Sequence, residues 1–226
     1  MSRDTLNLHI QEIKDEISTI GTLVEEATLK SIESLKKRDC DAAREIYLND
    51  RVINEKRYAV ENNVLIQIAT QQPLAHDLRL LAAMLEIASE LERMGDYAKG
   101  ICKVTLNLGN LDIDVPIKDI DTMGRLAVEM LHEAIDIFLN EDVPNARLLP
   151  LKDDQVDKIF SKVEKSIVHS MVAHPESIDH SNLLLWVVHN IERMADRVTN
   201  ICERTIFVVT GDLVELESKP KNLVGK

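Results

Sequence analysis

Aromatic residues, glycine and proline are all scarce in this sequence of 226 residues. Phe, Trp and Tyr together make up 3% of the chain, and there are only 7 glycines and 6 prolines. A β-sandwich needs strands rich in aromatic and β-branched residues, so this composition argues against one. Hydrophobic residues still reach 45%, which is enough for a core of Leu, Ile, Val, Ala and Met. We therefore expect an all-α protein with long helices.

The sequence also lacks the features of secreted, membrane-spanning and nucleic-acid-binding proteins. Three cysteines without a CxxC spacing give neither a disulfide framework nor a zinc site. The longest apolar run, Leu183–Val188, is far shorter than the ~20 residues of a membrane span, and no apolar signal segment follows Met1. The formal charge of −12 disfavours contact with nucleic-acid phosphates. We expect a cytoplasmic protein with no membrane insertion and no nucleic-acid partner.

Apolar residues spaced three and four apart predict six long helices in two sets of three. The predicted ranges are 4–37, 41–70, 74–108, a helix through 120–134, then 144–173 and 178–210. Asp41 is expected to cap the second helix. Pro73 and Pro175 break the chain before each third helix, and Pro150 either kinks the fifth helix or delays its start.

A duplication relates the two sets of helices. The segment Leu91–Lys103 aligns without gaps to Ile191–Glu203 at an offset of 100, and Glu, Arg, Met, Asp, Ile and Cys match. Both copies lie in a third helix that follows a proline break. The predicted organisation is one three-helix repeat in residues 1–110, a second in 117–211 and a polar tail in 212–226.

Each third helix carries a Glu-xxx-Asp pair on its expected inner face. The predicted core stripe of the first copy comprises Leu78, Leu81, Leu85 and Ala88. Heptad steps extend this stripe to Glu92, and Asp96 lies one turn further along. Glu192 and Asp196 hold the same places in the second copy. Carboxylates on a core-side face need a positive partner, because an unpaired buried charge is costly.

The second helix of each set offers further oxygen ligands. Asp50 and Asn54 lie four apart in one copy, and Asp153 and Asp157 lie four apart near the expected middle of the fifth helix. Four side-chain oxygens from two helices would suit iron, manganese, magnesium or calcium. Salt bridges between the third-helix carboxylates and the adjacent arginines explain the pattern equally well, so periodicity leaves both interpretations open.

The two copies of Leu/Ile-Glu-Arg-Met-Gly/Ala-Asp, together with the segment Pro73–Arg79, resemble the PhoU family of phosphate-transport regulators. The resemblance covers nearly the whole chain. It implies two three-helix bundles related by a pseudo-twofold axis, multinuclear metal clusters and no catalytic activity. It also implies contact with the ATPase subunit of a phosphate ABC transporter and with a phosphate-sensing histidine kinase, usually as a homodimer. A peripheral position at the inner face of the membrane would suit these partners.

The resemblance also assigns ligands, with iron as the first choice and zinc, manganese or magnesium as alternatives. The residues that match the family's metal motifs are Glu92, Asp96, Glu192, Asp196, Asp153, Asp157, Asp50 and Asn54. The asparagine departs from the family pattern, since a neutral amide binds transition metals weakly. The site of the first copy is therefore expected to be the weaker one.

Two other kinds of protein remain as alternatives. A carboxylate-bridged dimetal redox or metal-storage bundle would need two Glu-xxx-His motifs, and the sequence offers one pair, Glu129 with His132, that is not repeated. A metal-free adaptor would use its carboxylates only to pair with arginine.

Overall fold

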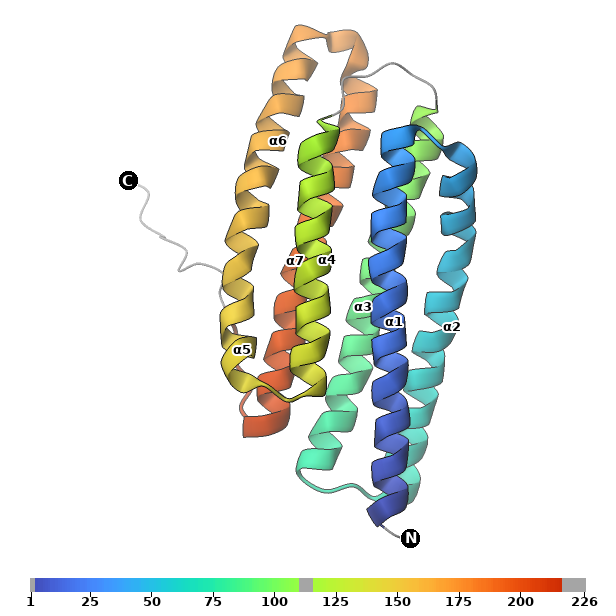
Figure 1. Ribbon diagram of the computed structural model, residues 1–226, viewed down its shortest axis with the longest axis vertical. Coiled ribbons are helices and arrows are strands. Elements are labelled where there is room, and N and C mark those ends of the chain that lie inside the picture. Colours follow the sequence, from blue (N-terminus) through green and yellow to red (C-terminus); the bar gives the residue numbers. More distant parts are fainter. Residues whose placement is uncertain (1–2, 110–115, 217–226) are drawn as a thin grey trace, which may run out of the picture.

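The computed structural model describes residues 3–109 and 116–216, and this part of the chain is helical with no strands. Its elements, in chain order, are α1 (Arg3–Lys37), α2 (Cys40–Gln71), α3 (His76–Leu108), α4 (Ile117–Leu139), α5 (Val143–Leu148), η1 (Leu149–Lys152), α6 (Asp153–Ala173), η2 (Pro175–Ser177) and α7 (Ile178–Thr210). The six long helices run along one common axis (Figure 1). We call α1–α3 the first unit and α4–α7 the second unit. The all-α fold with two three-helix repeats is confirmed.

The core of the first unit follows the predicted rhythm in α1. Ile13, Ile17, Ile20 and Val24 are at most 2% exposed. The cap of α2 differs from the prediction, because Asp39 and not Asp41 precedes the helix. The Oδ1 atom of Asp39 accepts hydrogen bonds from the backbone N–H groups of Asp41 and Ala42 at 3.1 and 2.9 Å. Two aspartates so close in sequence are equally good caps, and only the backbone turn decides between them.

Only half of the predicted core stripe of α3 is confirmed, because Leu81 and Ala88 are buried but the predicted register fails at Leu78 and Leu85. Leu78 is 41% exposed and Leu85 is only partly buried. The buried residues at alternating spacings of four and three are Leu80, Met84, Ile87, Leu91, Met94, Ala98 and Ile101. Glu92 and Asp96 therefore lie at the edge of the buried face instead of in its centre. Apolar residues on two adjacent stripes made either register plausible in the sequence.

Proline divides the predicted fifth helix of the second unit. The short helix α5 ends at Leu148, and Pro150 lies in the 3₁₀ turn η1 before α6 begins. Proline cannot donate the backbone hydrogen bond that a continuous helix needs at this point. Asp153 consequently lies in the first turn of α6, so its predicted place near the middle of a helix was wrong.

The units pack side by side, with α1 against α4 and α3 against α7, while α2 and α6 form opposite edges (Figure 1). A Cβ atom at Gly21 of α1 would collide with Ile135 of α4, and one at Gly124 of α4 would collide with Ile32 of α1. These two glycine–isoleucine contacts are equivalent in the two repeats. Gly124 lies 103 positions after Gly21, and Ile135 lies 103 positions after Ile32. The units therefore meet through a pseudo-twofold axis, and their buried residues form one continuous core.

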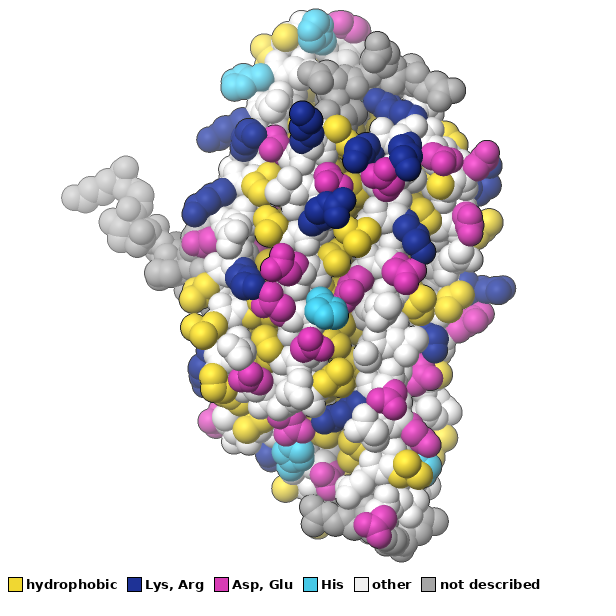
Figure 2. All heavy atoms as spheres, in the orientation of Figure 1, with side chains coloured by type: hydrophobic (Ala, Val, Ile, Leu, Met, Phe, Trp, Pro, Cys, Tyr) yellow, Lys and Arg dark blue, Asp and Glu magenta, His cyan; other side chains and the backbone are white. Residues whose placement is uncertain are grey.

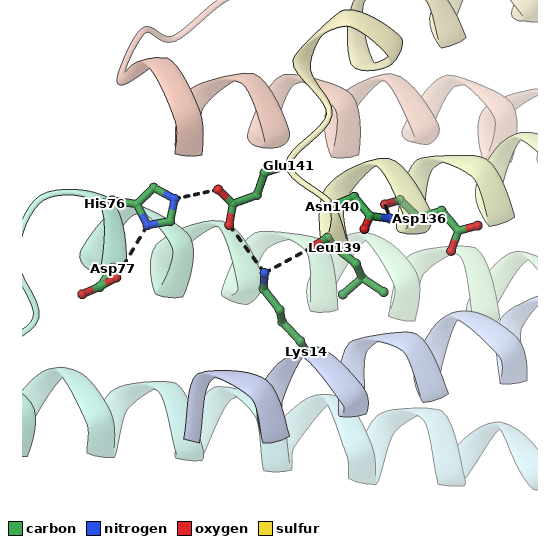
Figure 3. Close-up of polar contacts among 7 residues, drawn as sticks. All are labelled: Lys14, His76, Asp77, Asp136, Leu139, Asn140 and Glu141. Atoms are coloured by element: carbon green, nitrogen blue, oxygen red, sulfur yellow. Dashed lines mark hydrogen bonds and ion pairs between the residues drawn. The ribbon is translucent and has the colours of Figure 1, made fainter. Parts of the chain in front are cut away.

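A polar cluster fastens the end of α4 to the first unit (Figure 3). Glu141 accepts from His76 Nε2 at 2.7 Å and lies 3.5 Å from the Lys14 ammonium. The same ammonium donates to the carbonyl of Leu139 at 3.2 Å. Glu141 has a positive φ of 55°, so the chain turns sharply after α4 where this contact forms.

The start of the predicted tail packs on the second unit. Gly211 ends α7 in the left-handed conformation, as the sequence predicts. Val214 and Leu216 pack against the core, and the Leu216 N–H donates to Glu203 at 2.8 Å. Residues 217–226 lie outside the described residues, as does the predicted connection between the repeats except for Pro116.

Candidate functional site

The predicted ligand residues form two equivalent sites, one between α2 and α3 and one between α6 and α7. Asp50 and Asp153 are the deepest members, with exposed fractions of 6% and 2%. The third-helix glutamates are half-buried, and the aspartates four residues later are exposed. All ten positions of 91–100 have the same degree of burial as the corresponding positions of 191–200. The two third helices therefore present the same pattern of buried and exposed positions to their sites.

Lys99 occupies the site of the first unit, and the sequence analysis missed it. Its ammonium lies 2.7 Å from Asp50 Oδ2 and 3.9 Å from Asp96 Oδ1. The Asn54 amide donates to the same Asp50 oxygen at 3.0 Å. The ion pair raises the pKa of Lys99, so the ammonium stays charged. One signal was available in the sequence, since the duplication aligns Lys99 with Thr199.

Electrostatic repulsion at the first site is therefore partly relieved by the protein itself. Loss of hydration, followed by the charge of Asp96, raises the pKa of Glu92, and Arg57 opposes this shift. Loss of hydration and the Asp50 charge raise the pKa of Asp96, and Lys99 opposes that shift. The first site thus contains acids and bases close together.

The second site carries more uncompensated negative charge. Loss of hydration, followed by the charges of Asp196 and Asp157, raises the pKa of Glu192 to about 7. The positive charge of Arg193 opposes this rise in pKa, but its effect is the smallest of the four. Its guanidinium lies over the Tyr97 ring of the first unit, 5.3 Å from the centroid. Arg57 acts more strongly on Glu92 than the adjacent Arg93 does, and Arg193 opposes the rise at Glu192 without preventing it. Salt bridges to the adjacent arginines therefore account for the sites only in part.

The two donor sets differ in their fit to a metal cation. Within residues 3–109 and 116–216, no three Asp, Glu, His or Cys side chains are arranged as a site that could hold a metal ion. The second site nevertheless has four carboxylates in its predicted ligand set, and the pKa of Glu192 is raised by loss of hydration and by the charges of Asp196 and Asp157. This oxygen-rich set fits a hard divalent or trivalent ion. The first site does not fit, because Lys99 and Asn54 already bind its most buried carboxylate.

Replacing Glu192 with glutamine is expected to stabilise the metal-free protein at pH 8. The folded state holds the Glu192 proton up to a pKa of about 7, against an ordinary value of 4.5. Its contribution to stability is therefore complete below pH 4.5 and is lost as the pH rises through 7. After allowance for solvent screening, we expect a gain of about 1 kcal/mol, or roughly 2–4 °C in Tm.

The measurement is thermal unfolding in chelator at pH 5 and pH 8. The gain should be full at pH 8 and much smaller at pH 5. Glu92→Gln is the matched control, and it should give a smaller gain, because Arg57 opposes the rise in the pKa of Glu92. An equal Tm gain at both pH values would contradict the assignment.

The residues of the dimetal alternative lie at the surface. His132 is 65% exposed, and its Nδ1 atom lies 3.1 Å from Glu25 of α1. Its other ring nitrogen lies 3.7 Å from Asp136. Glu129 is 63% exposed and lies 3.9 Å from the Lys152 ammonium. This pair does not reach the bundle interior, where a ferritin-like dimetal site is built.

The duplicated cysteines are core residues. Cys102 and Cys202 are fully buried. Loss of hydration raises the pKa of each thiol to about 12. A thiol with so high a pKa is a poor nucleophile and a poor ligand, because both roles need the thiolate.

The outer surface carries charges of both signs. On the face formed by α1 and α4, Lys and Arg side chains alternate with Asp and Glu over the whole area (Figure 2). A nucleic-acid-binding face would instead gather basic side chains. In the described part of the chain, every helix is too short or too polar to cross a bilayer.

Comparisons with known proteins match both units. The family model of the PhoU domain matches residues 17–105 and 120–205. The phosphate-specific transport system accessory protein PhoU homolog of Streptococcus pneumoniae is 31% identical over 95% of this chain and 99% of its own. The accessory protein PhoU of Escherichia coli K12 is 28% identical over 91% of this chain and 85% of its own.

Solved structures agree with the sequence matches. The crystal structure of the phosphate transport system regulatory protein PhoU from Streptococcus pneumoniae superposes with a TM-score of 0.86 and 30% identity. It covers 93% of this chain and 100% of its own. PhoU from Pseudomonas aeruginosa gives a TM-score of 0.84 at 25% identity, over 91% and 99% of the two chains.

Proposed function

Because this chain belongs to the PhoU family, we propose that it is an accessory protein of a phosphate-specific transport system and regulates phosphate uptake. The observation that carries this proposal is the match of both repeats to one family over nearly the full length of a curated relative. The relatives are named as accessory or regulatory proteins and not as enzymes. A regulatory role without catalysis follows.

The regulation proceeds by protein contact. The chain binds the ATPase subunit of the phosphate ABC transporter and a phosphate-sensing histidine kinase, and it holds the phosphate-starvation response down when phosphate is ample. Helix α2 lies at an edge of the molecule (Figure 1). It exposes several apolar side chains, which supports such contacts. These residues are Leu48, Val52, Tyr58, Leu65 and Ile66. Exposed apolar side chains on one helix suit a protein interface, including that of a homodimer.

The second site binds a metal ion, with iron as the first choice. Asp153, Asp157, Glu192 and Asp196 would hold it. The bound cation would neutralise carboxylates that otherwise repel one another at the α6–α7 edge. The partners place the protein in the cytoplasm, at the inner face of the membrane.

The direct test is deletion of the gene in cells grown with ample phosphate. We expect alkaline phosphatase to rise many-fold, because the response loses its negative regulator. A plasmid copy of the wild-type gene should restore the low level. Alkaline phosphatase that stays low in the deletion strain would refute the proposed role in the phosphate response.

A further inference from the structure

The two sites share a framework but differ in charge at three equivalent positions. Asn54 of the first unit corresponds to Asp157 of the second, and Lys99 corresponds to Thr199. Arg57 likewise corresponds to Phe160. Burial is matched at each of these pairs, since all six side chains are partly buried. The differences therefore act at a similar depth below the surface.

The Lys99 ammonium lies where a cation would be needed. Asp50 is the most buried carboxylate of its site, and its Oδ2 atom accepts from Lys99 at 2.7 Å and from Asn54 at 3.0 Å. The Lys99 ammonium also lies 5.4 Å from the centroid of the Tyr47 ring, within cation–π range. Asp50, Asp96 and Tyr47 thus surround one ammonium at this site.

We infer that Lys99 takes the place of a metal cation in the first unit, so that only the second unit binds metal. This inference rests on the proposed metal binding of the second unit. A metal ion entering the first site would have to displace an ammonium from a buried carboxylate and then lie beside that positive charge. Like charges a few ångströms apart repel strongly in a partly buried setting.

The charge count of the two sites agrees with this assignment. The first site has three carboxylates, the Lys99 ammonium and the Arg57 guanidinium, for a net charge of −1. The second site has four carboxylates and a threonine in place of the lysine, for a net charge of −4. The affinity of an oxygen-ligand site rises with the number of its charged ligands. The first site consequently has a built-in counter-ion, and the second site requires one from solution.

The test measures Mn²⁺ bound to the full-length chain after removal of metals by a chelator, using equilibrium dialysis and elemental analysis. Glu192→Ala with Asp196→Ala should abolish binding, and Glu92→Ala with Asp96→Ala should leave it unchanged. The double variant Asn54→Asp with Lys99→Thr gives the first site four carboxylates and a threonine, as in the second site. This variant should bind about twice as much Mn²⁺ as wild type, because the sites are separate.

The reciprocal change, Thr199→Lys, should remove Mn²⁺ binding from an otherwise unaltered chain. Lys103→Thr is the control for the Lys99→Thr change, since this exposed lysine lies one turn beyond Lys99 and its replacement removes the same positive charge. Equal losses from the two alanine pairs would overturn the inference. Binding that appears only in Asn54→Asp with Lys99→Thr would support the role of Lys99 and refute metal binding by the second unit. No Mn²⁺ bound to any variant would overturn both.

Discussion

Replacing Arg197 with alanine is expected to lower the free energy of unfolding by about 2–3 kcal/mol, or roughly 5–10 °C in Tm. Arg197 joins the two units, with its Nη1 atom 2.6 Å from Glu90 and its Nε donating to the Tyr97 hydroxyl at 2.8 Å. The side chains of Arg197 and Glu90 are only 14% and 17% exposed. Loss of the arginine leaves a mostly buried carboxylate without its counter-charge, which costs far more than loss of a surface ion pair.

Arg204→Ala is the matched control for this prediction. Arg204 also joins α7 to α3, through Glu86 at 2.8 Å, but that glutamate is 54% exposed. Water can solvate Glu86 after the substitution, so we expect a loss below about 1 kcal/mol. Urea unfolding of both variants gives the comparison. Similar losses of unfolding free energy in the two variants would show that burial does not set the strength of these ion pairs.

Replacing Gly124 with alanine should destabilise the protein by about 1–3 kcal/mol. The added methyl group would collide with Cδ1 of Ile32, and that side chain is 1% exposed in a packed core. Ile32 has little room to rotate away, so α1 and α4 would have to separate. Because Gly21 and Ile135 make the equivalent contact, Gly21→Ala should have a similar effect.

A double-mutant cycle separates the collision from other effects of the substitution. Ile32→Val removes the Cδ1 atom and by itself should cost about 1 kcal/mol. The double variant Gly124→Ala with Ile32→Val should be more stable than the sum of the single losses predicts, because valine leaves room for the new methyl group. Additive losses would show that the glycine has another role.

These two contacts explain how a duplicated chain forms one rigid body. Arg197 and Tyr97 are equivalent residues of the two repeats and contact each other, so this hydrogen bond lies close to the pseudo-twofold axis. The glycine–isoleucine contacts form the other side of the same interface. The four inner helices thus hold α2 and α6, with their carboxylate sites, at fixed positions on opposite edges (Figure 1).

Much of the fold could be predicted from local sequence signals. The last helix has the predicted bounds, Ile178–Thr210, because a proline precedes it and Gly211 ends it. Pro150 breaks the helical hydrogen bonding wherever it stands, so an interruption there was expected. The duplication and its family motif likewise depend on residue identity alone.

Predictions that needed positions around a helix were less secure. Leu78 and Leu80 are both apolar, and only contact with α1, α2 and α7 buries the stripe of Leu80 and leaves Leu78 exposed. The start of α6 could not be predicted from the sequence either, because a helix can begin again one or several residues after a proline. Asp153 was therefore predicted too far inside its helix.

The sequence by itself determined the helices, the duplication, the family and the residues of both carboxylate sites. Each of these depends on neighbours within a few turns of one helix or on a direct comparison of the two repeats. Asn54 already predicted that the sites are unequal, and only the tertiary structure brought the ammonium of Lys99 into the first one. Lys99 and Asp50 are 49 residues apart, and their 2.7 Å contact exists only because α2 and α3 pack in one particular register. A charge acts through space, so its partner is fixed by the packing of helices and not by its place in the chain.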